Sequence, residues 1–194
     1  GSLKELIVDS LVLDLGQALS TKLSGHFSGL TDTVSPPRGN LTIHMLSVNE
    51  AETRKYLPDT LFPEGLDLSG TADLQGVIMA EKNSLRGNLA LGTGYGLVRA
   101  EAGMQRDTAT GRENINMQLY SEGFALDSLL QKEDTLGNLA FHVNITGSTR
   151  NFRNPHLNYD ITVAGFQYMG YTYSDLIAAG RYSADTLQLE ATMR

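Results

Sequence analysis

Apolar and polar residues alternate with a period of two along most of this chain. From residue 66 to residue 76 every second position is apolar or glycine, and the positions between them are polar. The same pattern recurs in five other stretches: 41–45, 110–121, 139–145, 157–163 and 176–193. In the first of these, Leu41, Ile43 and Met45 are predicted to share one face. Such alternation is typical of antiparallel strands with one apolar and one solvated face. The sequence therefore predicts an all-β fold, built as an elongated antiparallel sheet.

The N-terminal part of the chain carries weaker signals. Leu11, Leu13 and Leu15 indicate one strand, and Leu23 begins a second. Residues 3–9 fit either a helix or a strand. Three short polar segments are predicted to be loops: 31–38, 106–112 and 148–155.

Helical signals are scarce. Asn49 followed by Glu52 resembles a capping box and predicts a short helix over 50–57. The stretch 124–132 predicts about two helical turns, with Asp127 as its cap. We expect both segments to act as plugs over an open end of the sheet.

The tripeptide Gly-Asn-Leu occurs three times, beginning at Gly39, Gly87 and Gly137, with spacings of 48 and 50 residues. Gly and Asn tolerate positive φ, so we interpret each copy as the end of a turn followed by an inward-pointing Leu. Near-equal spacing favours a supersecondary unit laid down repeatedly, as in elongated repeat proteins. The alternative is that ordinary hairpin residues recur by chance.

Residues 3–194 are predicted to form a single elongated β-repeat domain. The 194 residues, 41% of them apolar, suit one domain or a piece of something longer. Gly1 and Ser2 resemble the scar that a protease leaves when an expression tag is removed. Alternation continues through Leu187 and Leu189 to Met193, so we interpret the chain as a fragment that stops inside a strand.

Small residues occupy many predicted inward positions. Aromatic residues make up only 7% of the chain, whereas a closed β-sandwich fills its inner faces with bulky side chains. Small inward residues leave space that a further protein layer or an apolar ligand can fill. The residues in question are Gly70, Ala72, Gly76, Gly92, Ala100 and Ala102. We therefore expect an apolar trough, although small residues also mark bends in strands.

The residue types needed for chemistry are absent or scattered. A net charge of −7 and the lack of a basic stripe argue against a nucleic-acid partner. The absence of Cys removes thiolate chemistry, and the four His are dispersed, with His44 and His142 predicted to point outward. No carboxylate pair or nucleophile motif stands out. We expect no catalytic site, no metal and no cofactor.

Two clusters of residues resemble binding sites, but a structural role explains each of them better. Gly92-Thr-Gly94-Tyr-Gly96 suggests a phosphate loop, but no helix or Lys follows it, so we interpret it as a bend or bulge in the sheet. Tyr168, Tyr171 and Tyr173 could bind a sugar or peptide. We interpret them instead as aromatic residues that stabilise a strand pair.

Several phrases of the chain resemble one known family. The stretch 136–147 (LGNLAFHVNITG) is followed by 157–165 and 168–176, with similar strand-opening phrases at 23–29 and 66–76. Their order and spacing resemble the repeated strand units of TamB/AsmA-like envelope proteins, particularly those of Bacteroidetes. The resemblance covers most of residues 20–185.

The resemblance implies a long parent protein that is anchored in the inner membrane and spans the periplasm of a Gram-negative bacterium. It implies a sheet folded into a trough, along which phospholipid acyl chains pass toward the outer membrane. Some family members also work with an outer-membrane barrel protein.

Our main hypothesis is a segment of such a lipid-conducting trough. The residues predicted to line it are Leu68, Ala72, Leu74, Leu89, Leu91, Met117, Leu119, Phe141, Val143, Ile161 and Val163. Ordinary core packing is the alternative role for each of them. A second hypothesis is an assembly module that binds client strands of outer-membrane proteins by strand augmentation. A third is a structural or adhesion module, or an enzyme whose site carries no recognisable motif.

Overall fold

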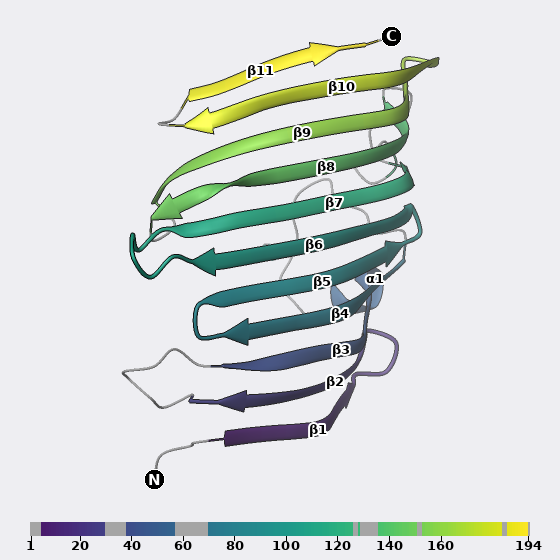
Figure 1. Cartoon of the computed structure of the whole chain (residues 1–194). Helices are drawn as coiled ribbons and strands as arrows, with labels where there is room; N and C mark the ends of the chain where they lie inside the picture. The colour runs from purple at the N-terminus through teal and green to yellow at the C-terminus, as the bar shows by residue number, and fades with distance from the viewer. Residues whose placement is uncertain are drawn as a thin grey trace.

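The fold is a single antiparallel sheet of eleven strands arranged in chain order, so every strand pairs with its sequence neighbours (Figure 1). The computed structural model describes residues 5–29, 38–56, 70–125, 128, 136–150, 153–183 and 186–193. The strands are β1 Glu5–Asp14, β2 Leu19–Ser28, β3 Arg38–Asn49, β4 Thr71–Glu81, β5 Ser84–Thr93, β6 Gly96–Arg106, β7 Glu113–Ala125, β8 Leu136–Arg150, β9 Arg153–Tyr168, β10 Tyr171–Ser183 and β11 Thr186–Thr192. The all-β, trough-like antiparallel sheet predicted from the sequence is confirmed.

The sheet is open, with β1 and β11 as its two edges. One short helix, α1 Glu50–Thr53, follows β3. In Figure 1 the sheet is curved, and α1 lies behind it, on the inner side of the curve. In the described ranges, no helix has the length and apolar character needed to cross a membrane.

A bulge in β3 corrects the predicted face of Met45. Ile43 pairs with Gly76 of β4 and Leu46 pairs with Leu74, so His44 and Met45 together oppose a single residue of β4. An extra residue reverses the side-chain alternation beyond it. Leu46 therefore continues the apolar face, and Met45 points to the opposite face, where it is exposed.

The segment between β5 and β6 is a tight hairpin, which corrects two interpretations. Thr93 pairs with Gly96, and Gly94 and Tyr95 form the turn, so this segment is not a bend inside a strand. Gly92 pairs with Leu97 and Asp73 and lies on the face opposite Leu91. Its predicted inward position is wrong. Gly70 lies just before β4 and is exposed, so it does not line the sheet either.

Strand ends account for the remaining differences from the predicted elements. Residues 5–9 belong to β1, which settles the open choice in favour of a strand, while Leu15 lies beyond its end. The helix predicted over 50–57 is shorter, since α1 ends at Thr53 and gives way to a turn. The helix predicted from Phe124 is wrong at its start, because Phe124 and Ala125 end β7. Asp127 lies outside the described residues.

Two of the predicted loops can be compared with the strands. The turn between β6 and β7 lies within the predicted loop 106–112. The predicted loop 148–155 is much shorter, because β8 extends to Arg150 and β9 begins at Arg153. Residues 30–37 lie outside the described part of the chain.

The three Gly-Asn-Leu copies lie inside strands β3, β5 and β8 rather than at the ends of turns. None of Gly39, Gly87 and Gly137 has a positive φ. The first two copies are two strands apart and the last two are three strands apart, so equal sequence spacing does not correspond to equal structural spacing. The inward direction of the three leucines is correct, as the strand register shows.

Candidate functional site

The candidate site is the apolar face of the sheet, which we define by rows of residues that pair from strand to strand. The central row crosses all eleven strands through Leu11, Leu23, Ile43, Gly76, Leu89, Ala100, Leu119, Val143, Ile161, Ala178 and Ala191. Every position is apolar or glycine. Because strands lie about 4.8 Å apart, this row is roughly 48 Å long, measured along the sheet.

Two further complete rows run beside the central one. The first is Val8, Gly25, Leu41, Ile78, Gly87, Ala102, Met117, Ile145, Tyr159, Gly180 and Leu189. The second is Leu6, Phe27, Gly39, Ala80, Leu85, Met104, Ile115, Gly147, Leu157, Tyr182 and Leu187. No charged residue occurs in any of the three rows, and the only polar atoms on their side chains are two tyrosine hydroxyls.

The apolar face is the inner face of the curved sheet. Thr21 and Ala72 have apolar-face register and pair with Leu46 and Val48, close to the end of β3 that α1 follows. Both are buried, whereas their neighbours Lys22 and Asp73 on the opposite face are exposed. Since α1 lies on the inner side of the curve, the rows defined above line the inside of the trough (Figure 1).

Ten of the eleven predicted lining residues share this face. Ala72 and Val163 are buried, and Leu91 is exposed. The other seven are half-buried: Leu74, Leu89, Met117, Leu119, Phe141, Val143 and Ile161. Leu68 lies outside the described residues. The structure thus brings together residues that are as many as 91 positions apart in sequence, from Ala72 to Val163.

The rows also contain residues that were not among the predicted lining set. Leu11 and Leu187 lie on the edge strands, and Tyr159 and Ala178 lie near the C-terminal edge. The signal that identifies them is the same alternation, and the register shows that it is continuous from one edge to the other.

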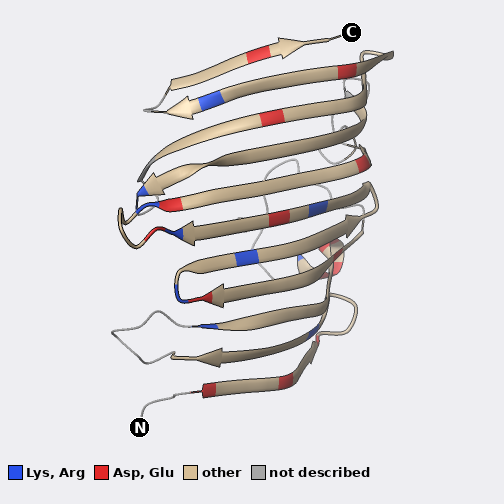
Figure 2. Cartoon of the chain, in the orientation of Figure 1, with Lys and Arg blue, Asp and Glu red and all other residues tan. Residues whose placement is uncertain are grey.

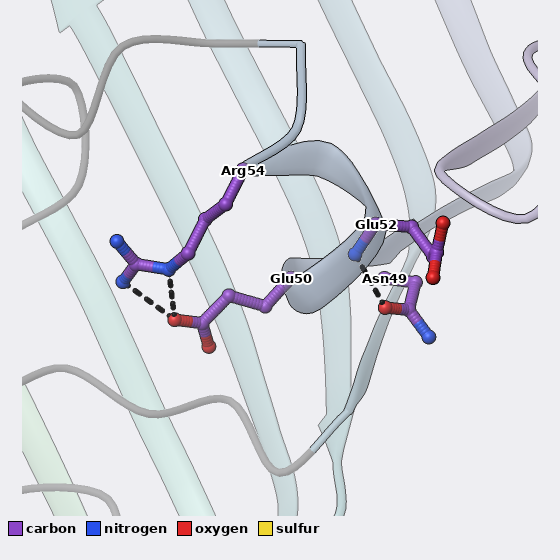
Figure 3. Close-up of polar contacts among 4 residues, drawn as sticks. All are labelled: Asn49, Glu50, Glu52 and Arg54. Carbon is purple, nitrogen blue, oxygen red and sulfur yellow. Dashed lines mark hydrogen bonds and ion pairs between the residues drawn. The ribbon is translucent and has the colours of Figure 1, made fainter.

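α1 is held in place by hydrogen bonds at its start and at its end. The side chain of Asn49 accepts a hydrogen bond from the backbone N–H of Glu52 at 3.1 Å, as the capping pattern predicts (Figure 3). The N–H of Asn49 and the hydroxyl of Thr53 both donate to the Ala18 carbonyl, each at 2.9 Å. These bonds hold α1 against the turn between β1 and β2.

An ion pair lies on α1. Arg54 donates from Nε and Nη2 to Glu50 Oε1 at 2.8 and 2.6 Å (Figure 3). Glu50 is buried, and a buried carboxylate needs such a partner to offset the loss of hydration. The Arg54 guanidinium thus offsets the charge of the buried Glu50 carboxylate.

The opposite face is polar and carries most of the charges of the central strands, whereas Arg106 of β6 and the buried Glu113 of β7 have apolar-face register beyond the outermost of the three rows. Figure 2 shows Lys, Arg, Asp and Glu scattered along the strands and grouped near strand ends. A hollow of about 430 Å³ lies on this face over β5–β7, with Gly103 at its centre. Seven of its twelve lining residues carry amide or charged side chains: Arg86, Asn88, Glu101, Gln105, Asn114, Asn116 and Gln118. The other five, which include Ala102, Met104 and Ile115, are apolar or glycine.

The aromatic and histidine residues have structural contacts. Phe166 and Tyr173 stack with ring centroids 5.0 Å apart, which for Tyr173 agrees with our interpretation of the tyrosine cluster as strand-stabilising. His44 and His142 are exposed on the polar face. Among the described residues, no group of three or more His, Asp or Glu could hold a metal ion.

Comparisons with family models, with curated proteins and with solved structures found no match for this chain. The geometry of the apolar face is therefore the basis on which a function can be inferred.

Proposed function

We propose that the apolar face binds the acyl chains of phospholipids, so that this sheet forms a segment of a lipid-conducting trough in the cell envelope. The observation that supports the proposal is the continuity of the three rows, which cross every strand from β1 to β11 without a charge. Lipid would move across the strands, from one edge of the sheet toward the other.

The energetics of such a trough require no specific polar contacts. Each CH₂ group that leaves water for an apolar surface contributes about 0.8 kcal/mol. The polar head group stays in water at the open side of the sheet. The length of the face also suffices, because the hydrocarbon core of a bilayer is about 30 Å thick and holds two acyl chains end to end.

We also propose where this trough lies in the cell. The resemblance to TamB/AsmA-like strand units supports a periplasmic location and a parent protein anchored in the inner membrane. It also supports an outer-membrane barrel protein as a partner.

A second candidate function is the binding of client strands of outer-membrane proteins. The observation in its favour is that β1 and β11 each pair on one side only. An unpaired edge can accept an extended segment through backbone hydrogen bonds. This function predicts binding of amphipathic strand peptides without any lipid.

The proposal can be tested with two substitutions at adjacent residues of β8. Phe141 lies on the apolar face, and His142 lies on the polar face. We expect Phe141→Asp to reduce phospholipid loading at least tenfold, because a carboxylate on the lipid path must be desolvated. His142→Asp carries the same new side chain and should load normally.

The measurement is native mass spectrometry with lipid extraction after exposure to phospholipid vesicles, with circular dichroism to confirm that both variants fold. Lipid on the wild-type chain that is lost only in Phe141→Asp supports the trough. No lipid on the wild-type chain, or normal loading of folded Phe141→Asp, contradicts it. Binding of amphipathic strand peptides in the absence of lipid loading would favour the second candidate.

A further inference from the structure

The polar, outer face of the sheet, which is turned toward the viewer in Figure 1, has two hollows that the lipid proposal does not use. The first is the hollow of about 430 Å³ over β5–β7. The second has a volume of about 280 Å³ and lies over β7–β9. Gln118 of β7 lines the first and Tyr120 of β7 lines the second. Side chains two residues apart on a strand point to the same face about 7 Å from each other, so the two hollows adjoin.

The first hollow exists because its centre carries no side chain. A Cβ built on Gly103 would have the Asn116 carbonyl oxygen, at 4.0 Å, as its nearest neighbour. Ala102, Met104 and Ile115 line the hollow too, but their side chains belong to the apolar rows on the other face. They therefore contribute backbone to its floor, and the amide and charged side chains form its walls.

The side chains of these walls have hydrogen-bonding capacity to spare. Among the described residues, Asn88 donates to Glu101 at 3.2 Å, and no other hydrogen bond involves a wall side chain. The three wall amides of β7 are exposed, and each carries both donors and an acceptor. Arg86 and Glu101 contribute one charge of each sign, so the walls have no net charge.

The second hollow combines aromatic rings with small residues and a carboxylate. Tyr120 pairs with His142 of β8, and both are exposed on the outer face. Ala140 and Ala164 line the hollow between the longer side chains. Glu122 lines it as well and accepts a hydrogen bond from the Tyr120 hydroxyl at 2.7 Å. This hollow therefore offers apolar and aromatic surface next to a hydrogen-bond acceptor.

Irregular strand pairing shapes the second hollow. The register of β7 with β8 shifts between Ser121 and Phe124, and the register of β8 with β9 shifts between Ala140 and Phe141. Bulges of this kind re-aim side chains and are over-represented next to functional sites. The surface around Tyr120 thus differs from the regular polar face of the neighbouring strands.

The two hollows together have the chemistry that binds a sugar chain. A pyranose ring has apolar C–H faces, which pack against aromatic rings, and hydroxyl groups that both donate and accept hydrogen bonds. Tyr120 and His142 suit the C–H faces, and the amides of the first hollow suit the hydroxyl groups. Because the walls of the first hollow have no net charge, they favour a neutral chain.

An extended peptide suits this face less well than a sugar chain. Strands β5–β9 each pair with a neighbour on both sides, so their backbone groups are already used. A peptide strand binds a sheet mainly through such backbone groups at an edge. Sugar hydroxyls need only side-chain partners, and these are what the face presents.

We propose that the outer face binds a neutral glycan chain that crosses β5–β9. Gly103 pairs with Asn116, four residues before Tyr120 on β7, and Tyr120 pairs with His142. The path from Gly103 to His142 therefore crosses two strand spacings and four residues, roughly 17 Å in all. A tetrasaccharide covers this length. The site does not include the apolar face, so it is independent of the lipid proposal.

Binding can be measured on the full chain by isothermal titration calorimetry and saturation-transfer NMR. The probes are three neutral tetrasaccharides: cellotetraose, chitotetraose and maltotetraose. We expect at least one to bind with a dissociation constant on the order of 0.1 to 10 mM, because the site is open. A folded chain that binds none of them at about 10 mM overturns the proposal. Binding of a Ser-Thr hexapeptide without any glycan binding overturns it in favour of a peptide site.

Two glycines of the outer face provide a matched pair of variants. Neither Gly103 nor Gly92 has a positive φ, and a Cβ on Gly92 would have Asp73 O as its nearest neighbour at 3.9 Å. Gly92 lines neither of the two hollows. Isoleucine suits strands, so both Gly103→Ile and Gly92→Ile should fold, which circular dichroism checks.

Gly103→Ile fills the first hollow and should weaken glycan binding at least tenfold, whereas Gly92→Ile should bind like the wild type. Equal affinities of the two folded variants overturn the site.

Tyr120 provides a second pair that does not alter the backbone. Tyr120→Ala removes the ring and should weaken glycan binding roughly 3- to 10-fold. Tyr120→Phe keeps the ring and should bind within about twofold of the wild type. Equal losses in the two variants would mean that no sugar ring packs against Tyr120, and would overturn the path across the second hollow.

Discussion

The two faces of this sheet are built from the same eleven strands and differ in which side chains they present. On the inner face, three rows of paired residues cross the whole sheet without a charge. On the outer face, an equivalent row contains Asn88, Glu101, Gln118, Asn144 and Asp160. Soluble monomers rarely expose contiguous apolar patches of more than a few hundred Å². The difference supports our proposal that an apolar ligand contacts the inner face.

Glycines show the same contrast in their surroundings. Gly76 on the inner face has φ of 152°, and an added Cβ would meet the Asn88 carbonyl oxygen and the Leu89 side chain. Gly103 on the outer face has open space, with Asn116 O as its nearest contact at 4.0 Å. Close cross-strand packing therefore requires glycine at position 76 of the inner face but not at this outer position.

The largest expected effect on stability comes from replacing Gly76, with Gly103 as its counterpart on the outer face. Gly76→Ala should destabilise the chain by about 1–3 kcal/mol, because it strains the backbone and displaces Leu89. Gly103→Ala should lie within about 1 kcal/mol of the wild type. Urea denaturation measures both. Equal losses for the two variants would show that the two faces are packed alike.

A smaller effect on stability is expected from removing the hydroxyl of Tyr159, with Tyr120 as the comparison on the outer face. Tyr159 on the inner face donates to Gln188 O and so connects β9 to β11 across β10. Tyr159→Phe should cost about 0.5–1.5 kcal/mol and speed hydrogen exchange in β11. Tyr120 on the outer face donates to Glu122 at 2.7 Å within the same strand, and Tyr120→Phe should change little. Unchanged exchange in β11 of Tyr159→Phe would contradict the role of this bond.

The smallest expected effect is a titration on the outer face. The hydrogen bond to Glu122 raises the pKa of Tyr120 above its ordinary value of 10.0. The bond therefore stabilises the fold below pH 10.0, and this contribution is lost as the pH rises through the raised value. Ultraviolet titration should show that Glu122→Gln lowers the pKa of Tyr120 toward 10.0. An unchanged midpoint would mean that another group causes the shift.

The sequence predicts the faces of regular strands because side-chain alternation is a local property. Alternation alone assigns Leu41 and Ile43 to one face, and it does the same for every second residue of 139–145. No knowledge of the neighbouring strands is needed. The lining residues of the central strands follow from the same rule, and for that reason ten of the eleven share a face.

The errors arise where a distant strand determines the local geometry. Nothing in the residues around Met45 marks the extra residue of the β3 bulge, which exists because of how β3 fits against β4. Phe124 belongs to a stretch with helical propensity, yet it pairs with Leu139 of β8 and ends a strand. The Gly-Asn-Leu copies lie inside strands because pairing with neighbours overrides their tendency to form turns.

If the sheet conducts lipid as proposed, acyl chains contact the inner face and not the outer one. Leu119 and Gln118 are adjacent in β7 and point to opposite faces. A photoreactive benzoylphenylalanine at each position, irradiated with phospholipid vesicles and analysed by mass spectrometry, reports which face touches the acyl chains. Lipid binding in the trough predicts lipid adducts at position 119 and none at position 118. Equal adducts at both positions, or none at position 119, would contradict it.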